Sequence, residues 1–317
     1  MLKIYTNSVF TRHDTGVGHP ERAPRIDAAL EGVARAGLRE SILRDVEMHP
    51  DTERIIAKVH SRDYERELDD ACRAGYRLFH SIDNPISSAT FSAARAAVAA
   101  SLTAIDDIWR GGASKRGFVI ARPPGHHAEK VSAMGFCFFN TIACAGEWLR
   151  EQPGIERVFI FDFDVHHGNG TQHLFEERDD VYYASIHRYP FYPGTGAAAE
   201  IGSGKGRGFT KNFPLDGGVG DAAYLRTIES QLVKIIDDYK PNAILLSAGF
   251  DAHERDPLGG MNVTERAFGE ITQRIVECAD RWCDGRVFSL LEGGYDLEAL
   301  SASVAEHVHA LNANSAE

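Results

Sequence analysis

Apolar and polar positions follow two different patterns along the chain. Before residue 110, apolar side chains recur every three or four positions, which is typical of amphipathic helices. This pattern predicts helices over residues 25–37, 53–59, 62–74 and 88–110. From residue 117 onward, short apolar runs alternate with amphipathic segments, which indicates strands connected by helices.

The alternating region defines the expected fold. Its apolar runs predict strands over 117–123, 157–164, 181–187, 243–250 and 286–294. The intervening segments predict helices over 140–151, 170–177, 223–239, 264–282 and 297–311, with a glycine- and proline-rich loop before residue 208. Because strands that alternate with helices form βαβ units, we expect an α/β fold with a mainly parallel central sheet flanked by helices. No long polar linker divides the chain, so residues 1–317 are expected to form a single domain.

Four of the predicted strands end in polar, glycine-containing motifs. These motifs are "RPPGHHAE", "DVHHGNG", "FDAHERDPLGG" and "EGGYD". In open parallel sheets, ligands bind beyond the carboxyl ends of the strands. We therefore expect the four motifs to contribute to one site.

The stretch "IFDFDVHHGNG" carries the first candidate metal ligands. Side chains two residues apart on a strand point the same way, so Asp162, Asp164 and His166 are expected to converge. Buried carboxylates need a partner or a metal ion. The alternative is that the two aspartates are structural and cap the following helix. Asp251 ends another strand and would complete a three-ligand site with an open position, although an aspartate there also suits a simple turn.

Two further motifs offer groups for catalysis. His126 and His127 follow a strand end after Pro-Pro-Gly, and adjacent imidazoles can act as base and acid near neutral pH. Tyr295 follows two glycines, and its phenol can donate to a developing oxyanion. Taken alone, the histidines also suit a surface loop and the tyrosine a partly buried packing role. Oxygen-rich ligation fits Zn²⁺, but also Fe²⁺ or Co²⁺.

Composition narrows the class of protein. The chain has 34 basic and 46 acidic residues, a net charge of -12, which argues against direct nucleic-acid binding. No segment resembles a signal peptide or a membrane span, and the five cysteines include no C-x2-C pair. These features predict reduced thiols and a cytoplasmic protein.

Together the motifs closely resemble the histone deacetylase family of zinc amidohydrolases, especially its class II and bacterial branches. "RPPGHHA", "GFCFFN", "DFDVHHGNGTQ", "FYPGTG", "SAGFDAH" with "DPLGG", and "EGGY" occur in the family's order, and the resemblance spans residues 13–300. It implies the fold shared by arginases and deacetylases. A ureohydrolase such as arginase would need a two-manganese set of aspartates, which the sequence lacks.

The resemblance assigns roles residue by residue. The family's zinc ligands match Asp164, His166 and Asp251. The family's catalytic residues match His126, His127, Asp162, Asn169 and Tyr295. The family's substrate-binding residues match Gly135, Phe136, Tyr192, Leu258 and, by a looser alignment, Asp83. Asp162 and Asn169 would support the two histidines, with asparagine standing where some members have aspartate.

The family also binds potassium at two sites. The first matches Asp162, Asp164, His166, Ser185 and Ile186, partly through backbone carbonyls. The second matches Phe175, Arg178, Val181 and Phe209.

The resemblance implies hydrolysis of an N-acetyl amide to acetate and a free amine. We expect acetyl-lysine in proteins or peptides as substrate, with acetylated polyamines or other small amides as the alternative. A short early loop and Leu258 at the rim favour acetyl-lysine, because polyamine-selective family members have an insertion in that loop or a glutamate at the rim. A catalytically dead acyl-lysine binding module is a further alternative, against which the intact catalytic set argues. A homo-oligomer is compatible with the sequence.

Overall fold

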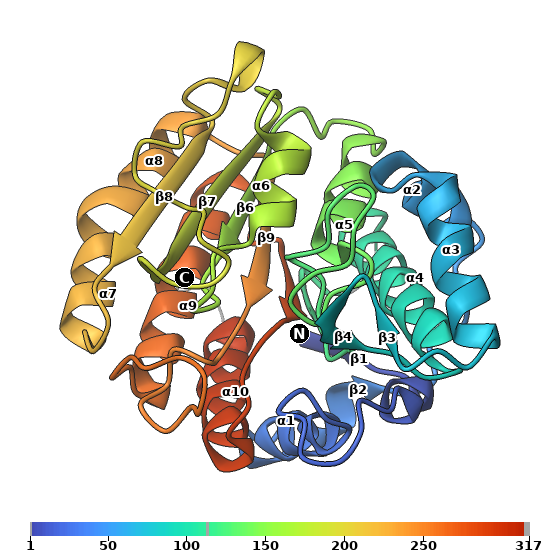
Figure 1. Cartoon of the computed structure of the whole chain (residues 1–317). Coiled ribbons are helices and arrows are strands. Elements are labelled where there is room, and N and C mark those ends of the chain that lie inside the picture. Colours follow the sequence, from blue (N-terminus) through green and yellow to red (C-terminus); the bar gives the residue numbers. More distant parts are fainter. Residues whose placement is uncertain (1, 112–113, 314–317) are drawn as a thin grey trace.

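The computed structural model describes residues 2–111 and 114–313, and it is built on one eight-stranded sheet (Figure 1). The strand order is β2-β1-β5-β10-β9-β6-β7-β8, and every neighbouring pair is parallel. The strands are β1 (Leu2–Tyr5), β2 (Ile42–Leu43), β5 (Arg116–Val119), β6 (Val158–Asp162), β7 (Val181–Arg188), β8 (Thr210–Leu215), β9 (Ala243–Ala248) and β10 (Val287–Leu291). The α/β prediction with a parallel sheet is confirmed.

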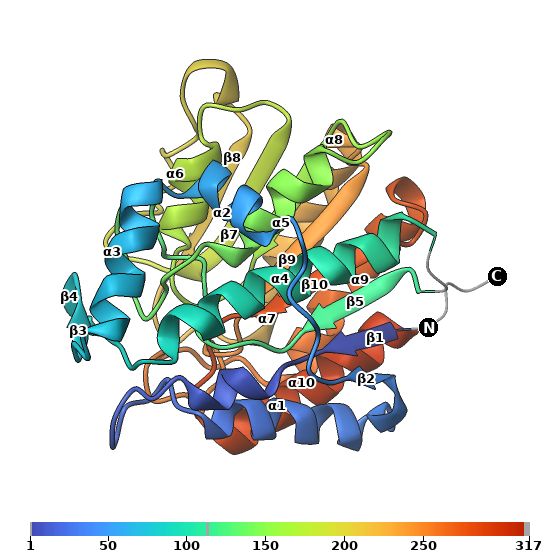
Figure 2. The ribbon, with the colours of Figure 1, turned by 90° about the vertical axis from the view of Figure 1, so that its right-hand side faces the viewer.

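Helices cover both faces of this sheet. They are α1 (Pro24–Arg35), α2 (Thr52–Val59), α3 (Arg62–Arg73), α4 (Thr90–Trp109), α5 (Thr141–Arg150), α6 (Asn169–Phe175), α7 (Asp221–Thr227), α8 (Val233–Tyr239), α9 (Glu265–Trp282) and α10 (Leu297–Asn312). Figure 1 shows α4 and α5 on one side of the sheet and α9 and α10 on the other. Outside these layers, α1 packs on α10, and α2 and α3 pack against α4 (Figure 2).

The prediction of a mainly helical first third was incomplete. Residues 2–111 also contribute β1, β2 and a small antiparallel pair, β3 (Leu78–Phe79) and β4 (Ser81–Pro85). Strands of two to five residues are too short to show a clear period. The edge strand β8 was also missed, because it contains Pro214 and polar residues, which only an edge strand tolerates well.

The helix predicted over 223–239 is one continuous helical segment that changes its winding. A π-helical turn, Ile228–Leu232, joins α7 to α8. None of the helices in residues 2–111 and 114–313 has the length and apolar character needed to cross a bilayer.

Strand order explains how distant motifs meet. The four strands that end in polar motifs are β5, β10, β9 and β6, and they are consecutive neighbours in the middle of the sheet. All four run in the same direction, so their carboxyl ends lie side by side. The motifs therefore converge at one edge of the sheet, where such folds place their sites.

Candidate metal centre and active site

The loop after β6 is shaped by its own carboxylates. The strand ends at Asp162, earlier than the predicted residue 164. Alternation along a strand therefore does not determine where the side chains of Asp164 and His166 point. Instead, the backbone N–H of Asp164 donates to Asp162 Oδ1 at 3.2 Å, and that of His166 donates to Asp164 Oδ1 at 3.0 Å. An aspartate that captures a backbone N–H two residues on is the standard Asx-turn. The turn brings His166 to Asp164, as predicted, whereas Asp162 Oδ2 contacts His126 and Tyr183 instead.

The three predicted metal ligands lie together. His166 Nδ1 is 3.1 Å from Asp164 Oδ1 and 3.1 Å from Asp251 Oδ2, and one donor atom from each residue lies within 4.8 Å of the others. Ligands at about 2.0–2.2 Å from a tetrahedral metal are roughly 3.3–3.6 Å apart, so the cluster is already near the required spacing. Three protein ligands leave one or two positions free, which is the pattern of catalytic metal sites.

Neighbouring backbone fixes the two carboxylates. Gly293 N–H donates to Asp164 Oδ2 at 2.8 Å, and Val165 N–H donates to Asp251 Oδ1 at 2.8 Å. Asp251 Oδ2 accepts no backbone N–H, and Asp164 Oδ1, which accepts from His166 N–H, keeps a second lone pair for a metal. A Cβ on Gly293 would lie 2.2 Å from Asp251 Oδ2, so a larger residue there would displace the ligand. Outer contacts of this kind orient metal ligands and tune their affinity.

The pKa values of His166 and Asp251 bear on how these residues would bind a metal. Burial lowers the pKa of His166, but hydrogen bonds to Asp164 and Asp251 outweigh burial and raise that pKa to about 10. Burial and the charge of Asp164 raise the pKa of Asp251 to about 7. Both shifts favour the protonated forms of His166 and Asp251, and both residues must be deprotonated to bind a metal.

Metal binding should consequently release protons. Titrating Zn²⁺ into the metal-free protein at pH 7 is expected to release roughly one to two protons, because His166 and part of the Asp251 population must deprotonate. Calorimetry in two buffers with different ionisation enthalpies measures this number. Affinity should fall about tenfold per pH unit for each proton released as pH drops. Equal heats in both buffers would contradict the proposed ligands.

The two tandem histidines have different environments. His126 Nδ1 lies 3.0 Å from Asp162 Oδ2, whereas His127 Nδ1 lies 2.7 Å from Asn169 Oδ1. Burial lowers the pKa of His126, but the charges of Asp162 and Asp164 raise it to about 10. Burial and the positive charges of His126 and His166 hold the pKa of His127 well below its usual value. One imidazole is thus kept charged and the other neutral, which is how paired groups acquire separate acid and base roles.

A pocket of about 230 Å³ opens onto this cluster. Its lining residues are Asp83, His127, Gly135, Phe136, His166, Phe191, Tyr192, Leu258 and Tyr295. All five residues predicted to contact substrate border it. A Cβ on Gly135 would lie 2.3 Å from His127 Cδ2, so this position must stay small for the histidine to keep its place.

Sequence reasoning did not identify Phe191 as part of the pocket. Its ring stacks on His166, with centroids 5.3 Å apart and planes 14° apart, and the Arg188 guanidinium lies 4.0 Å from its centroid. The available signal was its place beside Tyr192 in "FYPGTG", where proline limits the backbone and both neighbours can face one cavity.

Tyr295 is held from behind by Arg25, which the sequence also did not single out. Arg25 donates to the carbonyls of Gly294 at 2.6 Å and Glu292 at 2.5 Å, and its guanidinium carbon lies 5.0 Å from the Tyr295 ring centroid. Glu21, fully buried, accepts from Arg25 at 3.1 Å and from Arg122. Glu21 and Arg25 are four residues apart in "ERAPR", but Glu21 precedes α1, so the helical i, i+4 rule does not predict their pairing.

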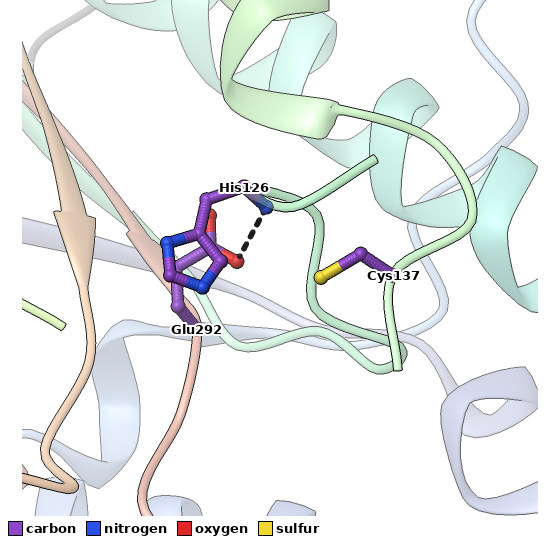
Figure 3. A group of neighbouring side chains, drawn as sticks. All are labelled: His126, Cys137 and Glu292. Carbon is purple, nitrogen blue, oxygen red and sulfur yellow. Dashed lines mark hydrogen bonds between the residues drawn. The ribbon is translucent and has the colours of Figure 1, made fainter. Parts of the chain in front are cut away.

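A second group of possible metal donors consists of His126, Cys137 and Glu292 (Figure 3). The Glu292 carboxylate already accepts from the backbone of Gly125 at 2.7 Å and of His126 at 3.2 Å, and from Ser247 at 3.1 Å. Burial raises the pKa of Glu292 to about 7 and that of the Cys137 thiol well above its usual value, which disfavours the thiolate a metal needs. The group instead fixes the "PGHH" turn to the end of β10.

The residues predicted to bind potassium fall into two neighbourhoods. Ser185 pairs with Asp162 across β6 and β7, which brings together the first group, Asp162, Asp164, His166, Ser185 and Ile186. In the second group, Arg178 N–H donates to the Phe175 carbonyl, and the Phe209 carbonyl accepts from Tyr183, while Val181 begins β7. Each of these carbonyls retains one lone pair.

His167 lies away from the pocket lining. Its ring contacts Thr195 Oγ1 at 2.8 Å and Gln172 Oε1 at 2.9 Å, and burial lowers its pKa to about 2. Both ring nitrogens therefore have partners, which is the arrangement of a structural histidine.

A family model, curated relatives and a solved structure all match this chain. Residues 19–311 match the family model described as "Histone deacetylase domain". The chain is 37% identical to "Histone deacetylase 14, chloroplastic" of Arabidopsis thaliana, over 97% of this chain and 76% of that protein. It is 36% identical to "Probable deacetylase" of Archaeoglobus fulgidus, over 93% of this chain and 81% of the other. The solved structure described as "Crystal Structure of HDA15 HD domain" superposes with a TM-score of 0.89 at 34% identity, covering 98% of this chain and 88% of that one. The chain therefore belongs to the histone deacetylase family.

Proposed function

We propose that this protein is a zinc-dependent deacetylase that hydrolyses the acetyl amide of acetyl-lysine in proteins or peptides. One observation carries the proposal: a single pocket of about 230 Å³ brings a candidate ligand, His166, together with His127 and Tyr295 and with aromatic walls. Family membership supports deacetylase chemistry in general. The pocket supports the narrower choice of substrate.

The donor set supports the choice of metal. One imidazole and two carboxylates in an open, three-ligand arrangement suit catalytic Zn²⁺, and Fe²⁺ or Co²⁺ would fit the same donors. Bound there, the metal would polarise the amide carbonyl and lower the pKa of a water molecule. Asp164, His166 and Asp251 are the residues we propose to hold it.

The protein groups supply the proton transfers. His127 is kept neutral, so it can accept a proton from the attacking water and return it to the leaving amine. His126, charged through Asp162 and Asp164, contributes a nearby positive charge while the amide oxygen becomes negative. Tyr295 lines the same pocket, and we propose that its hydroxyl donates to that oxygen.

The channel fits a straight aliphatic stem. The ring centroids of Phe136 and Tyr295 are 6.0 Å apart and those of Tyr192 and His127 are 5.3 Å apart, so each aromatic wall packs edge-on against a proposed catalytic residue. We propose that Gly135 offers its carbonyl to the substrate amide N–H, that Leu258 forms the rim and that Asp83 holds the peptide backbone. A potassium ion at the first of the two sites named above would offset the negative charge of Asp162 and Asp164, and the second site, at the start of β7, stays a prediction. The cytoplasmic location and a homo-oligomeric state stay predictions.

One observation favours a second substrate class. Asp83 borders the pocket and is only partly buried, and a carboxylate at that place could equally pair with an ammonium group. Acetylated polyamines combine a linear acetyl amide with such an ammonium. They are therefore the competing substrate.

Measuring acetate release distinguishes a peptide deacetylase, a polyamine deacetylase and a non-catalytic binding module. The zinc-loaded protein should release acetate from an acetyl-lysine peptide with a higher kcat/KM than from an acetylated polyamine. The reverse order would replace the first substrate with the second. Binding of the peptide without any acetate release would instead establish a binding module. The exposed Glu254→Gln variant, near the ligand loop but outside the pocket lining, is the matched control and should behave as the parent protein.

A further inference from the structure

A chain of three hydrogen bonds runs from His127 to the protein surface. His127 Nδ1 is 2.7 Å from Asn169 Oδ1, and Asn169 Nδ2 donates to Glu129 Oε1 at 2.5 Å. The same Glu129 oxygen lies 2.8 Å from His173 Nδ1. Asn169 is 3% exposed, whereas the Glu129 and His173 side chains are 24% and 41% exposed. Glu129 thus links a buried amide to solvent, and none of the roles assigned so far uses it.

The donor and acceptor groups determine which way each of these hydrogen bonds runs. A carboxylate accepts hydrogen bonds and cannot donate them when ionised, so Glu129 must face the Asn169 NH₂ group. The amide oxygen then faces His127 and can only accept, so His127 Nδ1 must carry the proton. This leaves the Nε2 lone pair free, and His127 lines the pocket. An imidazole in that tautomer is ready to accept a proton.

We infer that Glu129 is a positioning residue that selects the base-competent tautomer of His127 by fixing the orientation of the Asn169 amide. The inference rests on the proposed function of His127 as the base. Without Glu129, the Asn169 NH₂ group retains only the His127 carbonyl at 3.4 Å and the Met134 sulfur at 3.6 Å among the described residues. Both contacts are long, so the amide can turn over. A reversed amide donates to Nδ1 and moves the imidazole proton to Nε2, where it blocks catalysis.

The surrounding backbone keeps this amide within reach of both partners. Thr171 N–H donates to the His126 carbonyl at 3.2 Å, which ties the first turn of α6 to the tandem histidines. A Cβ on Gly170 would lie 2.2 Å from the Ala128 carbonyl oxygen, so the two segments are in direct contact. Asn169 can therefore rotate its amide but cannot move away, and orientation is the variable that Glu129 controls.

Two substitutions at Glu129 test the inference. Glu129→Met keeps the length of the side chain but removes the acceptor, and should lower kcat about tenfold to a hundredfold with KM within about twofold. Glu129→Gln keeps an acceptor oxygen and should retain kcat within about threefold. The exposed Glu177→Ala variant is the control and should match the parent protein. A kcat for Glu129→Met within about twofold of the parent would overturn the inference.

A double-mutant cycle distinguishes tautomer selection from a loss of general stability. Asn169→Asp gives His127 an acceptor that needs no orientation, but places a second carboxylate against Glu129. In that background, Glu129→Met should raise kcat, because it removes the repulsion and costs no orientation. A purely structural Glu129 would lower kcat in both backgrounds, and that result would overturn the inference.

Imidazole nitrogen shifts test the inference without turnover. In the zinc-loaded protein, His127 assigned by comparison with His127→Gln should show a protonated Nδ1, and Glu129→Met should shift the signals toward the other tautomer. This measurement stands even where no acetate is released, so failure of the proposed substrate and failure of the tautomer assignment give different results. Unchanged shifts in Glu129→Met would overturn the assignment.

Discussion

Tyr295→Phe is expected to lower kcat by about a hundredfold or more while the metal stays bound. The substitution removes only the hydroxyl, because the ring is held by packing against Phe136 and by the Arg25 guanidinium above it. The backbone N–H of Tyr295 also stays bonded to Asp256 Oδ2 at 2.7 Å. In the proposed mechanism, the substitution removes one donor to the oxygen that becomes negative in the transition state. Metal content by plasma emission spectrometry and acetate release from a peptide measure the two effects separately.

The role of Tyr295 can be judged from which quantity changes in Tyr295→Phe: kcat, KM or metal content. KM should change little if the hydroxyl contributes chiefly in the transition state. A variant with full kcat would rule out the tyrosine as an oxyanion donor. A variant that loses its metal would indicate instead that the turn after β10 carries the ligands indirectly, through Gly293 and Asp164.

Asp251→Asn is expected to have a larger effect, because it removes a ligand charge. Asn keeps the shape of the side chain and can still accept from Val165 N–H, as Asp251 Oδ1 does at 2.8 Å. It offers a neutral oxygen or an NH₂ group to the metal, which should lower metal affinity by about a hundredfold or more. Activity should fall with occupancy and recover in part when excess Zn²⁺ is added.

The control for Asp251→Asn is Glu254→Gln, which removes an exposed acidic group three positions along the same loop. Its metal content should equal that of the parent protein. Unchanged zinc content in Asp251→Asn would show that the ion binds elsewhere. The cluster of His126, Cys137 and Glu292 would then be the next site to test.

Much of the fold and site followed from local sequence, because the chemistry sits in short motifs at strand ends. The convergence of Asp164, His166 and Asp251 was predictable from apolar runs that stop at acidic residues and from the geometry of parallel sheets. The short strands β1 and β2 were not, since two to four residues carry no readable period. Their place is set by pairing with neighbours distant in the chain.

Contacts that hold the site residues in place from distant parts of the chain could not be predicted from local sequence either. Arg25 reaches a carbonyl 269 residues away, at Gly294, and nothing in its own neighbourhood identifies that partner. Glu129 stood inside a recognised motif, yet its contact with Asn169 depends on how α6 packs against the tandem histidines. Sequence indicates which groups do chemistry more readily than which groups hold them in place.

The central position of β10 bears on how this protein folds during synthesis. β10 lies between β5 and β9, although it follows every other described strand of the sheet along the chain. Until residues 287–291 emerge, β5 and β9 have no partner on the sides that β10 will occupy, and the two halves of the sheet remain apart. Exposed strand edges invite pairing with other chains. We therefore expect a chain that stops before β10 to aggregate more readily than the full sequence, because the facing edges of β5 and β9 stay unpaired.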